Sequence, residues 1–157
     1  MIRRAAMTDM DRIFGVHSAA VHGIARAYYS PAEVDVWAGR KSPKSYATSI
    51  SARVIIVDEE AEVIRGFAQL DPGTSSIEAV YVDPAYLRQG VGSRLLAALE
   101  SIAGASGTAR LTLDASLNSV PFYESAGYAR VADSLHELSP GISIACVLMQ
   151  KELRSAA

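Results

Sequence analysis

The sequence is poor in cysteine, in net charge and in long hydrophobic runs. Its one cysteine, Cys146, excludes an internal disulfide and a metal centre built from several cysteines, and it fits a reducing compartment. The 15 basic and 17 acidic residues leave a formal charge of -2, so no overall field attracts DNA or an anionic membrane surface. The longest apolar run, residues 142–149, is far shorter than the roughly 20 residues of a membrane-spanning helix.

The start of the sequence also lacks the unbroken apolar stretch of a secretory signal peptide, because residues 3–12 contain both arginine and aspartate. We therefore expect a cytoplasmic protein that binds neither nucleic acid nor membrane. Half of the 157 residues are hydrophobic and 20% are charged, which is typical of folded globular chains. The length, and the lack of a repeat or a linker, predict a single domain over residues 1–157.

Two helices are expected in the first forty residues. Thr8 followed by Asp11 resembles a capping box, and apolar residues at helical spacing after it predict a helix over residues 8–27. Ser30 followed by Pro31 opens a second, shorter helix that Gly39 ends.

Strands follow from residue 53. β-Branched residues at 54–57 and a strand-like stretch at 63–70 flank an acidic turn at 58–62, which predicts a hairpin. Residues 77–82 form a further strand with two largely apolar faces, so we place it in the centre of the sheet. By strict alternation, Ile77, Ala79 and Tyr81 share one face, and Glu78, Val80 and Val82 share the other.

The second half of the sequence predicts a parallel crossover. Leucines at helical spacing mark a helix over residues 91–102, and residues 110–114 form the next strand, so these elements make a βαβ unit with the strand before them. A short helix at 121–126, ended by Gly127, precedes two final strands at 128–135 and 142–149. The sum is an α+β fold in which an antiparallel meander leads into one parallel crossover.

The turn between the central strand and the helix, Leu87 to Ser93, is typical of a phosphate-binding loop. Gly90 and Gly92 allow a ligand close to the backbone, and the free N–H groups of the first helical turn favour an anion. A Walker loop would need a lysine after the second glycine. A dinucleotide-binding loop would need a small residue at Leu95, although Asp114 stands where its acid would be. Tight packing of strand and helix is the structural alternative.

With these motifs the chain resembles the GCN5-related N-acetyltransferases. The similarity is carried by Ser75–Glu100 (SSIEAVYVDPAYLRQGVGSRLLAALE) and Leu111–Tyr128, with a weaker match at the opening MIRRAAMTDMDRIFGVH and the least at residues 28–52. The resemblance implies a mixed, mostly antiparallel twisted sheet of six to seven strands with one parallel βαβ crossover and about four helices. It implies transfer of an acetyl group from acetyl-CoA to a primary amine of a small molecule or a protein.

The resemblance also implies a cofactor groove. Val80 and Val82 would act through backbone groups that are freed where two parallel strands splay apart, and Asn118 would bond the pantetheine or cap the following helix. The family usually has arginine or glutamine where this chain has Leu87, so the backbone N–H groups would carry the pyrophosphate. The full set of expected cofactor contacts is Val80, Val82, Arg88, Gln89, Gly90, Val91, Gly92, Ser93 and Asn118.

Glu78 and Tyr123 are the expected catalytic pair. An alkyl amine is almost fully protonated at neutral pH and needs a base, and a carboxylate among apolar neighbours at Glu78 would have a pKa raised toward the useful range. Tyr123, one turn into the short helix, would protonate the leaving thiolate. A partly solvated or ion-paired Glu78, and a Tyr123 that is a core aromatic, are the structural alternatives.

The acceptor end is expected near four residues of the first two helices: His17, His22, Tyr28 and Trp37. The two histidines are five residues apart rather than the four of a helical metal pair, so no metal is expected. Exposed sheet edges would be compatible with a homodimer. A non-catalytic acyl-CoA-binding module and a dinucleotide-dependent enzyme remain the competing functions.

Overall fold

The computed structural model describes residues 1–24 and 27–153. Seven strands form one sheet in the order β1-β2-β3-β4-β5-β7-β6. Their bounds are β1 Ile2–Arg4, β2 Val54–Glu60, β3 Val63–Asp71, β4 Ser76–Val82, β5 Arg110–Ser116, β6 Ala129–Ser139 and β7 Ile142–Glu152. The β4–β5 pair is parallel and every other pair is antiparallel. The expected mixed, mostly antiparallel sheet with one parallel crossover is confirmed.

Five α-helices surround this sheet in the described ranges, where about four were expected. They are α1 Met10–Ile24, α2 Pro31–Gly39, α3 Pro43–Ala52, α4 Val91–Ala105 and α5 Val120–Ser125. The additional one is α3, which begins at Pro43 after the cap Ser42 and buries Tyr46. It lies in the stretch where the sequence offers the weakest apolar periodicity.

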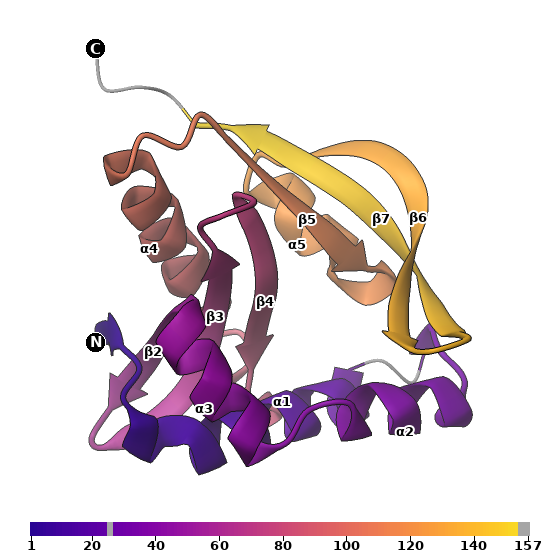
Figure 1. The fold of residues 1–157 in the computed structure, drawn as a ribbon, viewed down its shortest axis with the longest axis horizontal. Coiled ribbons are helices and arrows are strands. Elements are labelled where there is room, and N and C mark those ends of the chain that lie inside the picture. The colour runs from indigo at the N-terminus through magenta and orange to yellow at the C-terminus, as the bar shows by residue number, and fades with distance from the viewer. Residues whose placement is uncertain (25–26, 154–157) are drawn as a thin grey trace.

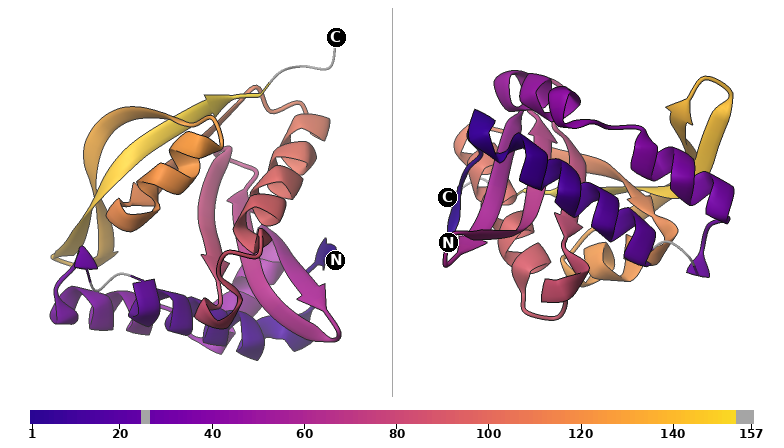
Figure 2. Two further views of the ribbon diagram at one scale, coloured as in Figure 1. Left: turned by 180° about the vertical axis from the view of Figure 1, so that it is seen from behind. Right: turned by 90° about the horizontal axis from the view of Figure 1, so that it is seen from below.

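The helices cover both faces of the sheet (Figures 1 and 2). One core contains buried residues of α4 and α5 together with Ala68 and Leu70 of β3. On the opposite face, α1 and α3 pack against β2 and β3 around Phe67, which is fully buried. A third cluster joins the end of α1 and α2 to β6 and β7 through Trp37 and Ile144. The helices α1 and α2 therefore connect the two halves of the sheet.

Of the two predicted helix caps, the structure contains one. At α2 the Ser30 hydroxyl accepts the Glu33 N–H and the Glu33 carboxylate accepts the Ser30 N–H, which confirms the helix predicted from Ser30 and Pro31. Thr8 and Asp11 do not form the expected capping box. A 3-10 turn at Met7–Asp9 precedes α1, and the Asp9 carboxylate accepts the Ala6 N–H at 2.7 Å. The predicted helix end near residue 27 involves residues 25 and 26, which lie outside the described ranges.

The hairpin of β2 and β3 has a tighter turn than the sequence suggests. Ala61 and Glu62 alone form the connection, both with positive φ. Asp58, expected in the turn, lies inside β2 and its side chain is fully buried. The acidic stretch predicted a turn that begins at Asp58. The prediction is wrong at this residue because three cationic groups, described below, compensate the buried carboxylate within the strand.

A β-bulge overturns the expected alternation along β4. Its register with β3 shifts between Gln69 and Leu70, so that Ala79 pairs with Gln69 but Ile77 pairs with Leu70. Ile77 therefore packs in the α4 core with Val80 and Val82, and not on the face of Ala79 and Tyr81 as predicted. The inserted residue is Glu78, whose side chain leaves the apolar face.

The parallel pair β4–β5 is short. Only Ser76 with Thr112 and Ile77 with Leu113 are paired, and beyond them the two strands diverge, as Figure 1 shows. The Asp83 N–H donates to Arg65 O of β3 at 2.9 Å, so by alternation the N–H and C=O groups of Val80 and Val82 face the side of β5. In the described ranges that edge of β4 has no partner strand.

No helix within the described residues combines the length and the apolar character needed to cross a membrane.

Candidate functional site

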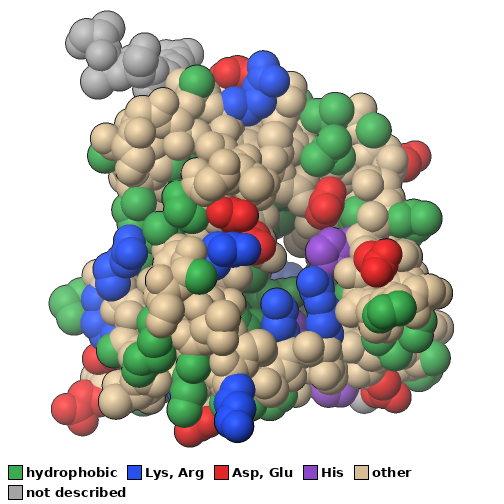
Figure 3. Space-filling model, viewed as in Figure 1, with side chains coloured by type: hydrophobic (Ala, Val, Ile, Leu, Met, Phe, Trp, Pro, Cys, Tyr) green, Lys and Arg blue, Asp and Glu red, His purple; other side chains and the backbone are tan. Residues whose placement is uncertain are grey.

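A cleft of about 590 Å³ opens where β4 and β5 diverge. Its walls come from β4, β5, the first turn of α4, α5 and the ends of α1 and α2. On the face seen in Figure 3, lysine, arginine and histidine side chains gather at a central hollow, and acidic side chains lie across from them. Pockets of this size hold small molecules and cofactors.

The glycine turn lies at one end of this cleft. Gly90 has a φ of +76° and precedes α4, whose first turn has no side-chain cap. A Cβ added at Gly92 would stand 3.4 Å from the Phe122 ring, so this glycine lets α4 approach α5. The N–H groups of Gly90, Val91, Gly92 and Ser93 make no hydrogen bond to the described protein groups. Leu87 and Gly92 line the cleft, and Arg88 and Gln89 are exposed in the turn before α4.

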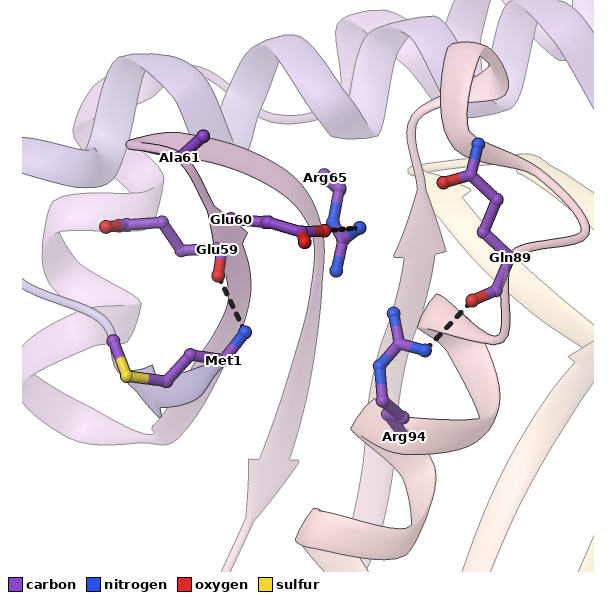
Figure 4. A pocket seen from close by; sticks show the side chains of 7 residues that line it. All are labelled: Met1, Glu59, Glu60, Ala61, Arg65, Gln89 and Arg94. Atoms are coloured by element: carbon purple, nitrogen blue, oxygen red, sulfur yellow. Dashed lines mark hydrogen bonds and ion pairs between the residues drawn. The ribbon is translucent and has the colours of Figure 1, made fainter.

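An ion-pair network joins the glycine turn to the hairpin of β2 and β3. The Arg94 guanidinium donates to Gln89 O at 2.9 Å and to Asp58 Oδ2 at 2.9 and 3.2 Å. Arg65 donates to the other oxygen of Asp58 at 2.9 Å, and the Met1 amine lies 3.3 Å from it. Figure 4 shows Arg94 beside Gln89, with Arg65 and Glu60 facing them from the hairpin. Burial raises the pKa of Asp58, but the arginine hydrogen bonds outweigh it and lower that pKa below its ordinary value.

Asn118 and Tyr123 project into the cleft from the segment after β5. The Asn118 Oδ1 atom is buried without a hydrogen-bond partner in the described chain, and Ser119 is the N-cap of α5, so the capping role expected as one alternative is absent. Tyr123 is 7% exposed and packs edge-on against Phe122 and Tyr128. Burial, and then the neighbouring Tyr81, raise the pKa of Tyr123, so its hydroxyl stays protonated at neutral pH.

Glu78 lies in the cleft but not in apolar surroundings. Its Oε1 atom accepts hydrogen bonds from Arg53 Nε at 2.9 Å and from Gln69 Nε2 at 3.1 Å. Its side chain is about one-third exposed. The expectation of an apolar environment is wrong, because the β-bulge turns Glu78 away from Val80 and Val82. Its Oε2 atom has no protein partner in the described ranges and stays available within the cleft.

Two of the four expected acceptor-end residues lie in the cleft. His17 is 2% exposed, with Nε2 3.3 Å from Trp37 O, and burial lowers its pKa to about 4. Trp37 Nε1 donates to the Tyr81 hydroxyl at 3.1 Å. His22 and Tyr28 are exposed and are not among the residues that line the cleft. His22 Nδ1 instead contacts Ser18 O one turn back along α1.

The structure adds four charged or titratable residues to this end of the cleft: Arg40, Lys41, Asp114 and His136. They come from the segment after α2, from β5 and from β6. From the sequence, Asp114 was expected only as the acid of a dinucleotide-binding loop, and the basic pair Arg40 and Lys41 was not expected at the cleft. The adjacent Arg and Lys beyond a helix end were the available signal. In the described residues, no group of three or more His, Cys, Asp and Glu side chains could hold a metal ion.

A comparison with known families shows which family the chain belongs to. The family model of the acetyltransferase (GNAT) domain matches residues 25–153. The chain belongs to the GNAT acetyltransferase family. A curated relative, the uncharacterised N-acetyltransferase YafP of Escherichia coli, is 27% identical over 130 residues, which cover 83% of this chain and 81% of that protein.

Solved structures of this family share the fold. A GCN5-related N-acetyltransferase from Rhodopseudomonas palustris superposes with a TM-score of 0.91 and 28% identity, covering 98% of this chain and 95% of that one. The PaiA N-acetyltransferase from Thermoplasma acidophilum, solved with coenzyme A, gives 0.82 at 20% identity over 97% and 98%. The putative acetyltransferase YncA from Salmonella typhimurium, solved with acetyl-CoA, gives 0.72 at 22% over 100% and 95%.

Proposed function

We propose that this GNAT protein transfers an acetyl group from acetyl-CoA to a primary amine by direct attack, with Glu78 as the base and Tyr123 as the acid. The observation that carries the proposal is the diverging β4–β5 pair, whose unpaired edge leads from the α4 N-terminus to Glu78 and Tyr123 in one cleft. Coenzyme A and acetyl-CoA in two structurally similar proteins support the choice of cosubstrate.

The residues present fit an acyl-CoA. The free N–H groups from Gly90 to Ser93 suit a pyrophosphate, because the helix dipole adds to their donors. The edge of Val80 and Val82 offers N–H and C=O groups at the spacing of a missing strand, which suits the amides of pantetheine. The buried, unpartnered Asn118 Oδ1 is an acceptor for a pantetheine N–H. When bound, acetyl-CoA supplies the acetyl carbon as an activated thioester.

The residues of this chain then divide the proton transfers. Glu78 Oε2, free of protein partners, takes a proton from the ammonium of the acceptor, directly or through one water, while Arg53 and Gln69 hold Oε1. The N–H of Val80 or Val82 donates to the carbonyl oxygen as negative charge develops there. The C–N bond forms, the C–S bond breaks, and the Tyr123 hydroxyl gives its proton to the departing sulfur. The second proton that leaves the nitrogen restores the Tyr123 hydroxyl, and the proton held by Glu78 passes to solvent. An amide, a free thiol and one proton are released.

Thiol release with acetyl-CoA and a panel of amines tests this proposal. Tyr123→Phe and Glu78→Gln are each expected to lower kcat by about 100-fold or more, the usual range for an acid or base. Their dissociation constants for CoA, measured by calorimetry, should stay within about twofold, since neither side chain is needed for the pyrophosphate or the β4 edge.

Matched controls separate chemistry from packing. Tyr128→Phe removes a buried hydroxyl from the same aromatic cluster but outside the cleft, and Glu62→Gln removes an exposed carboxylate. Both should keep kcat near that of the unchanged chain. If Tyr123→Phe and Glu78→Gln keep kcat as well, the assigned roles are wrong. If no amine in the panel releases thiol although CoA binds, the protein is the non-catalytic acyl-CoA-binding module.

A further inference from the structure

One end of the cleft contains two cations, Arg40 and Lys41, that form no ion pair with a carboxylate of the described chain. Arg40 and Lys41 follow α2 and line the cleft beside His136 of β6. Two carboxylates, Glu78 and Asp114, line the same end. The partners of these two acids determine whether Arg40 and Lys41 are available to bind an anionic ligand.

Neither acid is paired with Arg40 or Lys41. Glu78 accepts from Arg53 at 2.9 Å, and Arg53 also lies 3.7 Å from Asp71. Asp114 Oδ2 lies 3.7 Å from His136 Nδ1. The anionic side chains within reach are therefore directed to other groups.

His136 is the direct neighbour of Arg40. Arg40 Nη1 lies 2.6 Å from His136 Nε2, and because a guanidinium only donates, Nε2 is the acceptor and Nδ1 carries the proton toward Asp114. Burial and then the Arg40 charge lower the pKa of His136, which agrees with a neutral ring. Arg40 thus has a fixed orientation without a negative partner in the described residues.

Lys41 is partly buried and forms no ion pair within the described chain. Burial, followed by the Arg40 charge, lowers the pKa of Lys41, and the nearby Glu78 carboxylate offsets this only in part. Two adjacent cations, one of them partly desolvated, repel each other unless an anion lies between or beside them. A guanidinium held in one orientation is suited to a planar, two-oxygen anion.

We propose that the acceptor is a small amino acid whose free carboxylate binds Arg40 and Lys41 while its amine faces Glu78. This inference rests on the proposed acetyl transfer and specifies its substrate class. Trp37 and His17 bound the same end of the cleft and are both buried, so a small molecule fits there better than a folded protein surface. The carboxylate supplies the charge that the basic pair lacks, and it orients the amine toward the thioester.

The test compares amino acids with their carboxamides, which keep the amine and the side chain and lose only the charge. The best amino acid of a panel of twenty is expected to exceed its carboxamide in kcat/KM by at least tenfold. Lys41→Met and Arg40→Gln should each raise KM for the acid about tenfold, leave kcat within threefold, and leave the carboxamide unaffected. Lys44→Met, the loss of an exposed lysine on α3 outside the cleft, is the matched control and should change neither.

Equal kcat/KM for acid and carboxamide, or an equal loss for both in Lys41→Met, would overturn the proposal. Calorimetry with the CoA-loaded chain measures the dissociation constants of the amino acid and of its carboxamide, and this measurement does not need turnover. If no amine releases thiol but the amino acid binds more tightly than its carboxamide and Lys41→Met removes the difference, acetyl transfer fails and the carboxylate site stands. If the two probes bind alike, the carboxylate site fails whatever the activity.

Discussion

Replacing Asp58 by asparagine is expected to lower the free energy of unfolding by about 3 kcal/mol, the lower end of the range for breaking a buried ion pair. The Asp58 side chain is 0% exposed, and Arg65, the more buried of its two arginine partners, is 11% exposed, so that pair is screened little by water. Arg94 is 45% exposed and contributes less. Asparagine keeps the shape and one acceptor, but it removes the buried charged partner of Arg65, which then pairs only with the exposed Glu60.

Thermal unfolding measures this effect. For a chain of this length roughly 2–4 °C of melting temperature corresponds to each kcal/mol, so the expected decrease is about 6–12 °C. Glu62→Gln, which removes an exposed acid from the turn of the same hairpin, is the control and should shift the melting temperature by no more than about 2 °C. A decrease of similar size in both variants, or none in Asp58→Asn, would refute the argument from burial.

The pH dependence provides a separate check of the same residue. The pKa of Asp58 in the folded chain lies below its ordinary value, so the carboxylate stabilises the fold at pH values above about 4, where the unfolded chain is also ionised. That stabilisation is lost as the pH falls through the folded pKa. The difference in unfolding free energy between the unchanged chain and Asp58→Asn should therefore be constant near neutrality and shrink in acid. A difference that stays constant down to pH 2 would assign the effect to packing instead of charge.

Three further substitutions test other parts of the structure. Leu87→Gln restores a side-chain donor that the family usually has, and calorimetry should find CoA bound about tenfold more tightly, as for one hydrogen bond to a charged group. Tyr29→Phe removes a hydroxyl that accepts the Leu117 N–H and donates to Ala145 O, so chemical denaturation should give a loss of about 1–3 kcal/mol. Gly90→Val strains a φ of +76°, and both stability and CoA affinity should fall; unchanged values would mean that the loop conformation is unimportant.

Local patterns predicted most of the fold. The cap of Ser30 and Glu33, the β-branched run of β2 and the leucines of α4 are properties of short stretches, and each gave the element that the structure contains. The helix α3 was missed because it buries Tyr46 alone, although Ser42 followed by Pro43 was a readable start signal. Asp58 was placed in a turn because its compensating cations, Arg65 and Arg94, are distant in sequence or on another element.

The parts of the site that lie within one short segment of the sequence were predictable. The glycine turn and Tyr123 follow from contiguous motifs, and both lie at the cleft. The surroundings of Glu78 were not predictable, because the β-bulge depends on the pairing of β4 with β3. The basic pair at residues 40 and 41 belongs to the cleft only through the packing of α2 against β6 and β7, which no local pattern encodes.

The two-residue ladder between β4 and β5 makes the cleft width a property of distant contacts. Because β4 and β5 pair at only two positions, the angle between the two half-sheets depends mainly on contacts at the open end of the cleft. There the Tyr29 hydroxyl donates to a backbone carbonyl of β7, and the Trp37 indole donates to the Tyr81 hydroxyl of β4. These two aromatic side chains therefore set the separation of the two half-sheets at the open end of the cleft. Substitutions in α2 and in the segment before it would therefore change the width of the cleft, and with it the acceptors that enter, without replacing any residue that transfers a proton.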